Sequence, residues 1–436
     1  MARSTRIDPL EEDFPFKIIS HLITVPPFRE YPHAIIDEKK GVYLSVKQYI
    51  PRQDIEYPSS NADPITIIAN AGLGFIKEIY EPLFAEIYHR AKEAKLRIKS
   101  IWIADMFNLG ESAIANLDNL GCDATWLDHS RDMWSMINHF RDEMPKPIFG
   151  LGHSVGAVQL ACLSSWHPTL FHSLVFVEPG LDASYGKHIM FPVIFRTLQR
   201  KESWTTRKEA EMKAVKAQGA ETWADGARER LKRHGVFQHH ASWGSDWALT
   251  TPKNQIASMV LRHNPEEIGM GPGGLDEVTL EQRALVPDIN PDSIHKGPFY
   301  RPELELGWSL LPGMRPWVLY VNGGNSHDLG PAKVRDERAR ITGTGVGGSG
   351  GMKLGAVKQV VIEGGEHTLP FDHDLSKLAD HLGDWFVKES KRWEDGPKRR
   401  RAQWNNKAIE VKQAVTKEYF TDLTSEIKKQ KRAGKL

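Results

Sequence analysis

The chain has 436 residues, of which 40% are hydrophobic and 26% are charged, and its formal net charge at pH 7 is +1. This balance fits a globular protein with a sizeable core and argues against a global affinity for nucleic acid or for an anionic membrane surface. The two cysteines, Cys122 and Cys162, have no CxxC or Cys/His spacing, which argues against a disulfide framework or a structural zinc site.

Residues 1–14 become acidic soon after their start and contain no apolar run, so no secretory signal is predicted. No later run approaches the ~18 apolar residues of a membrane-spanning helix, and a soluble protein is expected. An antiparallel pair of strands near residues 18–25 and 43–50 should open the fold.

Short apolar runs, each followed by a turn of small residues, then alternate with helical patterns. This alternation predicts a mostly parallel sheet with crossover helices. The expected strands are residues 65–69, 101–104, 148–151, 174–177, 317–321 and 357–362. Together with the antiparallel pair they make an eight-stranded sheet.

The alternation of strand and helix patterns stops between residues 181 and 312. Residues 191–233 have a charged helical pattern, and residues 263–307 are irregular and rich in Pro and Gly. We interpret the whole segment as a helical cap, inserted where long insertions usually shape a substrate pocket. The predicted organisation is a core in two parts (residues 1–180 and 313–388), a cap between them (residues 181–312) and a C-terminal tail (residues 389–436).

Apolar residues in the tail recur every three or four positions, which predicts one amphipathic helix. They are Trp404, Ala408, Val411, Val415, Tyr419, Leu423 and Ile427. The basic run at residues 398–401 is interpreted as a solvated face rather than as a nucleic-acid site. This helix could dock on its own domain or on a second copy of the chain, so the sequence allows a homodimer.

The strongest motif is Gly-His-Ser-Val-Gly at residues 152–156, directly after the expected strand at residues 148–151. A G-x-S-x-G sequence between a strand and a helix is typical of a nucleophile elbow, a sharp turn that exposes the serine hydroxyl. The motif predicts that Ser154 is a nucleophile. The alternative is a serine in an ordinary strand-to-helix turn.

A nucleophilic serine needs a base, and His367 follows the last expected strand in the sequence EGGEHTLP. There an imidazole would lie at the same edge of the sheet as Ser154 and could accept its proton. His373 is the near alternative.

Two carboxylates compete to orient the base. Glu178 ends the expected strand at residues 174–177, and Asp328 follows the strand at residues 317–321. We favour Glu178, because an acid directly after an apolar run and before Pro179 is costly to bury without a partner. Asp328 stays open as the alternative acid.

The oxyanion formed during acyl transfer needs two backbone N–H donors. The first expected donor is the amide of Val155, next to the nucleophile. The second should come from the loop at residues 70–75, where glycines let the backbone approach a substrate, and Leu73 is the residue we choose. The alternative for this loop is a turn shaped only by packing.

Residues 343–348 match G-x-G-x-x-G, but they lie late in the chain and lack the βαβ context of a dinucleotide site. We expect a flexible loop there, and no cofactor and no metal are predicted.

Two blocks resemble a known family, the fungal α/β-hydrolases of secondary-metabolite and toxin biosynthesis. Residues 74–83 are similar to its GF-x-KE-x-YEPL block, and residues 126–132 are similar to its W-x-DH-x-RD block. The resemblance runs from about residue 16 to residue 385 and is greatest to the peroxisomal type I acyl-CoA thioesterase of mycophenolic acid biosynthesis. It implies an α/β-hydrolase fold with the acid after the sixth strand, which supports Glu178. The chain departs from that relative in two ways: Glu replaces Asp at this position, and Asn70 or Ala71 replaces the usual histidine of the oxyanion loop.

The resemblance also implies a reaction, the hydrolysis of an acyl-CoA thioester, in which coenzyme A enters only as part of the substrate. Its phosphates would favour cations at the pocket mouth, and the cap offers Arg196, Arg200, Lys201, Arg207 and Lys208. A carboxylesterase or lipase, or a hydrolase fold with a non-hydrolytic role, remain the alternatives. The C-terminal Gly434-Lys435-Leu436 approximates the S-K-L address read by the peroxisomal import receptor, so the peroxisomal matrix is the expected location.

Overall fold

A computed structural model describes residues 2–9, 11–52, 62–182, 187–239, 246–264, 268, 271, 273–288, 298–326 and 331–434. Asp328 of the predicted site, and Lys435 and Leu436 of the predicted address, lie outside the described residues. The chain divides into two compact units, Met1–Val387 and Lys388–Leu436.

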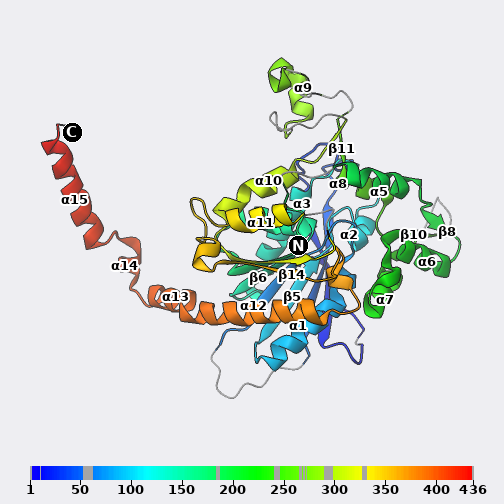
Figure 1. The fold of residues 1–436 in the computed structure, drawn as a ribbon, viewed down its shortest axis with the longest axis horizontal. Coiled ribbons are helices and arrows are strands. Elements are labelled where there is room, and N and C mark those ends of the chain that lie inside the picture. Colours follow the sequence, from blue (N-terminus) through cyan, green and yellow to red (C-terminus); the bar gives the residue numbers. More distant parts are fainter. Residues whose placement is uncertain are drawn as a thin grey trace. The chain divides into compact units, whose positions relative to one another are not determined.

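The first unit is built on a nine-stranded sheet in the order β1-β2-β3-β5-β4-β6-β7-β13-β14 (Figure 1). The strands are β1 (Ala2–Ile7), β2 (Phe16–Val25), β3 (Val42–Pro51), β4 (Ile65–Asn70), β5 (Ile98–Ala104), β6 (Ile148–His153), β7 (Ser173–Val177), β13 (Trp317–Gly323) and β14 (Val357–Ile362). The pairs β1·β2, β2·β3 and β3·β5 are antiparallel, and the other pairs are parallel.

All eight predicted strands are present in this sheet, but the predicted number of strands was wrong by one. The additional strand is β1, whose sequence ARSTRI has no apolar alternation to signal it. It is held at the sheet edge by pairing with β2 and by a 3.1 Å hydrogen bond between Thr5 Oγ1 and His21 Nδ1. Pairing with β2, rather than a pattern in its own sequence, therefore specifies this strand.

Helices cover both faces of the sheet. They are α1 (Glu81–Glu93), α2 (Gly110–Ala115), α3 (Trp126–His139), α4 (Val155–Trp166), α10 (Glu303–Leu310), α11 (Ala332–Ile341) and α12 (Ser376–Asp395), which continues beyond Val387 into the second unit. On β7, Val175 and Val177 join the apolar cluster that contains α1 and α12, whereas Leu174 and Phe176 join the cluster of α3, α4 and α10. This alternation makes a core of three layers, helix, sheet and helix.

The strand register aligns the carboxyl ends of the parallel strands at one edge. His153 on β6 is opposite Val177 on β7, Val177 is opposite Val321 on β13, and Gly323 is opposite Ile362 on β14. Loops that follow β6, β7 and β14 therefore meet at this edge, which is where ligands bind in open parallel sheets.

Between residues 181 and 312 the chain forms helices and two small antiparallel sheets. The helices before α10 are α5 (Lys187–Gln199), α6 (Arg207–Gln218), α7 (Asp225–His234), α8 (Lys253–Val260) and α9 (Leu280–Leu285). The sheets are β8 (Ser203–Trp204), β10 (Trp247–Leu249) and β9 (Val236–Gln238), and β11 (Arg262–His263) with β12 (Phe299–Tyr300). In Figure 1 the helices α5, α6, α7 and α8, coloured green, gather at one side of the sheet.

The second unit departs from the single amphipathic helix predicted for the tail. Its helices are α13 (Pro397–Asn405), α14 (Ile409–Gln413) and α15 (Lys417–Arg432). Ala414 is extended, and the Thr416 side chain accepts a 3.1 Å hydrogen bond from the Tyr419 amide, which starts a new helix. The N-terminal cap of α15 therefore divides the tail into separate helices, although its apolar residues recur at helical spacing.

The glycine-rich segment at residues 343–348 also differs from the flexible loop that the sequence suggested. The amides of Gly343 and Gly345 donate hydrogen bonds of 2.8 Å to the backbone oxygens of Leu311 and Pro312, which lie in the turn between α10 and β13. Among the residues that the structure describes, no helix is long and apolar enough to cross a membrane.

Candidate active site

Ser154 lies on a sharp turn between β6 and α4. Its φ is 53° and its ψ is −118°, a conformation that non-glycine residues rarely adopt and that marks a nucleophile elbow. Three backbone hydrogen bonds hold the turn: Ser154 N–H donates to Val177 O, and Ser154 O accepts from the amides of Ala157 and Gly180. The surrounding structure thus maintains a strained residue at the carboxyl edge of the sheet.

The two glycines of the motif are required by close backbone contacts. A β-carbon at Gly152 would lie 2.7 Å from Ala157 Cα, and one at Gly156 would lie 2.3 Å from the backbone oxygen of Asn70. Both distances are far below van der Waals contact, so the elbow packs against β4 and α4 only without these side chains.

We therefore expect Gly156→Ala to lower the free energy of unfolding by about 1–3 kcal/mol, the usual cost of overpacking. Urea denaturation measures this loss. Gly313→Ala is a matched control, since its β-carbon would meet only Val346 O, at an ordinary 3.7 Å. Equal stability of the two variants would contradict the packing account of the motif.

His367 follows β14 and reaches the nucleophile. Its Nε2 lies 3.0 Å from Ser154 Oγ, and its Nδ1 lies 3.3 Å from Glu178 Oε2. The imidazole thus bridges a hydroxyl and a carboxylate, an arrangement that can move a proton off the serine. His373, the alternative base, is exposed and makes no hydrogen bond to Ser154 among the described residues.

Glu178 follows β7 and is buried at 6% exposure, with a φ of 47°. Besides His367, its carboxylate accepts hydrogen bonds from the Gly323 amide and from the Ser326 hydroxyl. Its own amide donates to Val321 O at 2.8 Å. These contacts fix the carboxylate toward the imidazole. Asp328, the alternative acid, lies outside the described residues.

The two predicted oxyanion donors belong to segments next to the nucleophile. Val155 is the first residue of α4, so its N–H has no acceptor within the helix. Leu73 lies in the turn after β4, and within the described part of the chain its N–H makes no hydrogen bond. This turn is close to Ser154, because a β-carbon at Gly72 would be 3.2 Å from Ser154 Cβ.

Sequence reasoning missed two residues at this site, His153 and Tyr80. His153 is buried and hydrogen-bonds both to the Tyr80 hydroxyl and to the backbone oxygen of His367. His153 belongs to the motif at residues 152–156 and Tyr80 to the block at residues 74–83. A contact between positions 73 residues apart, however, leaves no local signal in the sequence.

Two of the five predicted cap cations line a common cavity. Arg200 and Lys201, together with Lys253, border a cavity of about 860 Å³ between α2 and the β8-β10-β9 sheet. The Arg200 guanidinium donates to Thr251 O at 2.9 Å. Arg196, Arg207 and Lys208 are not part of this lining.

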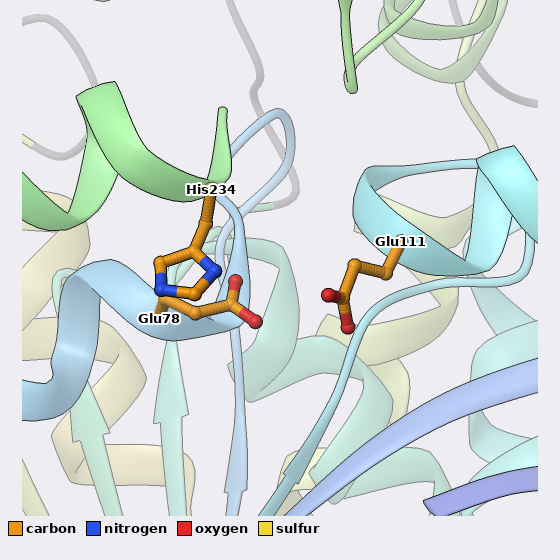
Figure 2. A group of neighbouring side chains, drawn as sticks. All are labelled: Glu78, Glu111 and His234. Carbon is orange, nitrogen blue, oxygen red and sulfur yellow. The ribbon is translucent and has the colours of Figure 1, made fainter. Parts of the chain in front are cut away.

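A separate group of side chains, Glu78, Glu111 and His234, has the donor atoms to hold a cation (Figure 2). The two carboxylates point toward one another, but Lys77 Nζ already lies 2.9 Å from an oxygen of each. Lys77 also contacts Asp105 Oδ2 at 2.6 Å. An ammonium group therefore holds the place of a metal in this buried cluster.

Lys77→Met should remove about 3–5 kcal/mol of stability, because it leaves the buried Asp105 without its ion-pair partner and takes the nearest cation from Glu78 and Glu111. Lys77 lowers the pKa of Glu111, although burial opposes the shift. A lowered carboxylate pKa contributes stability that is lost as the pH falls below 4.5. The difference between wild type and variant should therefore shrink in acid, as measured by urea denaturation at several pH values. Lys99→Met, at the exposed position near the start of β5, should change nothing. A pH-independent difference between wild type and Lys77→Met would be contrary to this account.

The strand order, the positive-φ serine at the end of β6 and the histidine after β14 together define an α/β-hydrolase. No family model matches the chain. The type I acyl-CoA thioesterase mpaH' of Penicillium brevicompactum is 32% identical over 403 residues, covering 87% of this chain and 89% of the relative. The mpaH thioesterase of Penicillium roqueforti is 31% identical over 401 residues, with the same coverage.

The fold is also that of a solved structure, the peroxisomal α/β-hydrolase Lpx1 of Saccharomyces cerevisiae. The TM-score is 0.62 at 13% identity, covering 97% of this chain and 99% of Lpx1. The chain belongs to the family of fungal α/β-hydrolases that includes the type I acyl-CoA thioesterases mpaH and mpaH'. It is a hydrolase.

Proposed function

We propose that the protein hydrolyses an acyl-CoA thioester in a fungal secondary-metabolite pathway, through an acyl-enzyme on Ser154. The observation that carries the proposal is the bridge made by His367 between Ser154 Oγ and Glu178. The thioester as substrate is supported by relatives with thioesterase names that align over most of both chains.

In the first step His367 Nε2 takes the proton of Ser154 as Oγ attacks the thioester carbonyl. The amides of Val155 and Leu73 stabilise the oxyanion, and Glu178 stabilises the imidazolium through Nδ1–H. The carbon–sulfur bond then breaks and the sulfur of coenzyme A takes the proton from His367; because the pKa of a thiol is about 8.5, far below that of an alcohol, its departure depends less on this protonation. In the second step His367 activates water, which releases the free acid and restores Ser154.

Two cavities support a substrate with one apolar and one anionic part. The first cavity offers Arg200, Lys201 and Lys253 to the phosphates of coenzyme A, beside the acidic residues Asp118, Glu202 and Asp246 of the same lining. A second cavity, of about 1060 Å³, is lined mostly by apolar residues, among them Phe195 of α5 and Leu261 directly after α8, and suits an acyl group. Leu73 of the oxyanion loop packs against the apolar cluster that contains Leu261, so a wall of this cavity adjoins the oxyanion loop, although no triad residue lines the cavity itself.

The proposal is tested with an acyl-CoA, the N-acetylcysteamine thioester of the same acyl group, and a set of simple esters. Release of the thiol or of the alcohol measures the rate of hydrolysis. The proposal predicts the highest kcat/KM for the acyl-CoA. Replacing Arg200 by Ala should raise KM for the acyl-CoA but not for the N-acetylcysteamine thioester, and Lys208→Ala is the matched exposed control. Rapid cleavage of simple esters with inert thioesters would replace the proposal by a carboxylesterase.

We also place the protein in the peroxisomal matrix, on the basis of its C-terminal tripeptide. Imaging a fluorescent fusion that keeps the C-terminus free, with and without residues 434–436, tests it; a location that does not change on deletion would refute the address.

A further inference from the structure

We propose that His153 and Tyr80 are positioning residues, which lock the loop that carries the oxyanion donor to the loop that carries the base. The proposal rests on the serine chemistry of the proposed function, but not on the identity of the substrate. It concerns residues that flank the triad and do not themselves contact the reacting atoms.

A single line of hydrogen bonds joins the two loops behind the nucleophile. The Gly72 amide donates to Tyr80 Oη at 2.8 Å, and Tyr80 Oη lies 2.8 Å from His153 Nδ1. At the other side of the ring, His153 Nε2 lies 2.9 Å from the backbone oxygen of His367. Gly72 precedes the expected oxyanion donor, and His367 is the expected base, so the line spans both ends of the reaction site.

The partners fix every proton along this line. A backbone oxygen can only accept, so His153 carries its hydrogen on Nε2 and donates it to His367 O. Its Nδ1 is then an acceptor and receives the hydroxyl hydrogen of Tyr80, whose oxygen accepts the Gly72 N–H. The line therefore has one direction, and neither residue can turn around without breaking a hydrogen bond at each end.

Burial keeps both residues in the neutral forms that the line requires. Burial lowers the pKa of His153 to about 3, with the nearby His367 acting in the same direction, and raises the pKa of Tyr80. The ring centroids of His153 and His367 are only 5.2 Å apart. A charged His153 would oppose the imidazolium that must form on His367, so a neutral donor is suited to this position.

Aromatic packing around His153 provides an alternative explanation that the test must separate. Phe75 and Phe371 lie 5.5 and 5.6 Å from its ring, so the residue also fills space in the core. Variants that keep the volume but remove a polar atom distinguish positioning from packing.

Tyr80→Phe is the central variant, because it removes one oxygen and leaves the ring in place. His153→Leu removes both polar atoms, whereas His153→Gln keeps an N–H that can reach the oxygen of His367. Tyr320→Phe is the matched control, since Tyr320 is equally buried and its hydroxyl bonds to Thr342 Oγ1 at 2.8 Å, outside the site. The readouts are kcat and KM with a small ester, the rate at which a fluorophosphonate labels Ser154, and the melting temperature.

We expect Tyr80→Phe to lower kcat and the labelling rate by about 10- to 100-fold at unchanged KM, the effect of small misplacements at a reaction site. His153→Leu should lose at least as much, with partial recovery in His153→Gln. Tyr320→Phe should lose similar thermal stability but keep its rate, which a purely structural role of Tyr80 would not produce.

Wild-type rates in folded Tyr80→Phe, or an equal loss in Tyr320→Phe, would overturn the inference. Should His153→Leu fail to fold, Tyr80→Phe still decides the matter, because it deletes only a hydroxyl. Failure of the proposed function has a different signature: the wild-type protein itself would not react with the fluorophosphonate.

Discussion

Ser154→Ala is expected to lower kcat by about 10⁴-fold or more, the loss seen when a catalytic nucleophile is removed. The reason is geometric: Ser154 Oγ is the hydroxyl 3.0 Å from His367 Nε2, and its positive φ aims it out of the turn between β6 and α4. The variant should fold normally, because alanine keeps the small side chain that the elbow accommodates. The measurement is steady-state hydrolysis of the best acyl-CoA in the panel.

Ser165→Ala provides the control for this prediction. Ser165 lies on the same helix, α4, and its hydroxyl donates to Cys162 O at 2.8 Å, away from the site. Its removal should leave kcat unchanged. Substantial activity in Ser154→Ala would mean that another group attacks the substrate, and the acyl-enzyme on Ser154 would have to be abandoned.

Glu178→Gln is expected to lower kcat by about 10⁴-fold, the effect of replacing the acid of a triad by its amide. The Glu178 carboxylate faces three donors, the Gly323 amide, the Ser326 hydroxyl and His367 Nδ1–H. An amide has only one oxygen, and its NH2 group would face one of these donors. The imidazole would then favour the tautomer with its hydrogen on Nε2, which cannot accept the proton of Ser154.

Asp328→Asn is the companion to this experiment, because sequence reasoning left the two acids open. If Glu178 orients the base, Asp328→Asn retains most of the activity. Glu178→Asp keeps the charge and should be less impaired than Glu178→Gln. The reverse ranking, with Asp328→Asn inactive and Glu178→Gln active, would transfer the role to Asp328.

Much of the fold could be predicted because its signals are local. Each central strand is a short apolar run before a turn of small residues, and both faces of these strands are buried. The elbow combines such a strand with G-x-S-x-G and a helix, so the conformation of Ser154 followed from neighbouring residues. The strand β1 lacked any such pattern, since its pairing with β2 supplies the order.

The site was predictable only where chain order carries the information. His367 was found because bases follow the last strand of this fold, and Glu178 because a charge ended an apolar run. The Gly72–Tyr80–His153 line could not be found, because it joins the loop after β4, the helical turn before α1 and the end of β6, which meet only in the folded state.

The two sequence blocks that resemble the family did not reveal what their charged residues do. Lys77 of the first block lies in a buried ion-pair cluster, and Asp132 of the second forms 2.9 Å hydrogen bonds with Arg29 through both of its carboxylate oxygens. Asp128 caps α3. These charged residues belong to the blocks that resemble the family, yet in the structure they make ion-pair and capping contacts outside the triad.

The most direct test of the central claim is intact-mass analysis after treatment with a fluorophosphonate, followed by peptide mapping. The account predicts one adduct per chain on wild-type protein, located on Ser154, and no adduct on Ser154→Ala. An unmodified wild-type chain, or an adduct that persists in Ser154→Ala, would contradict it.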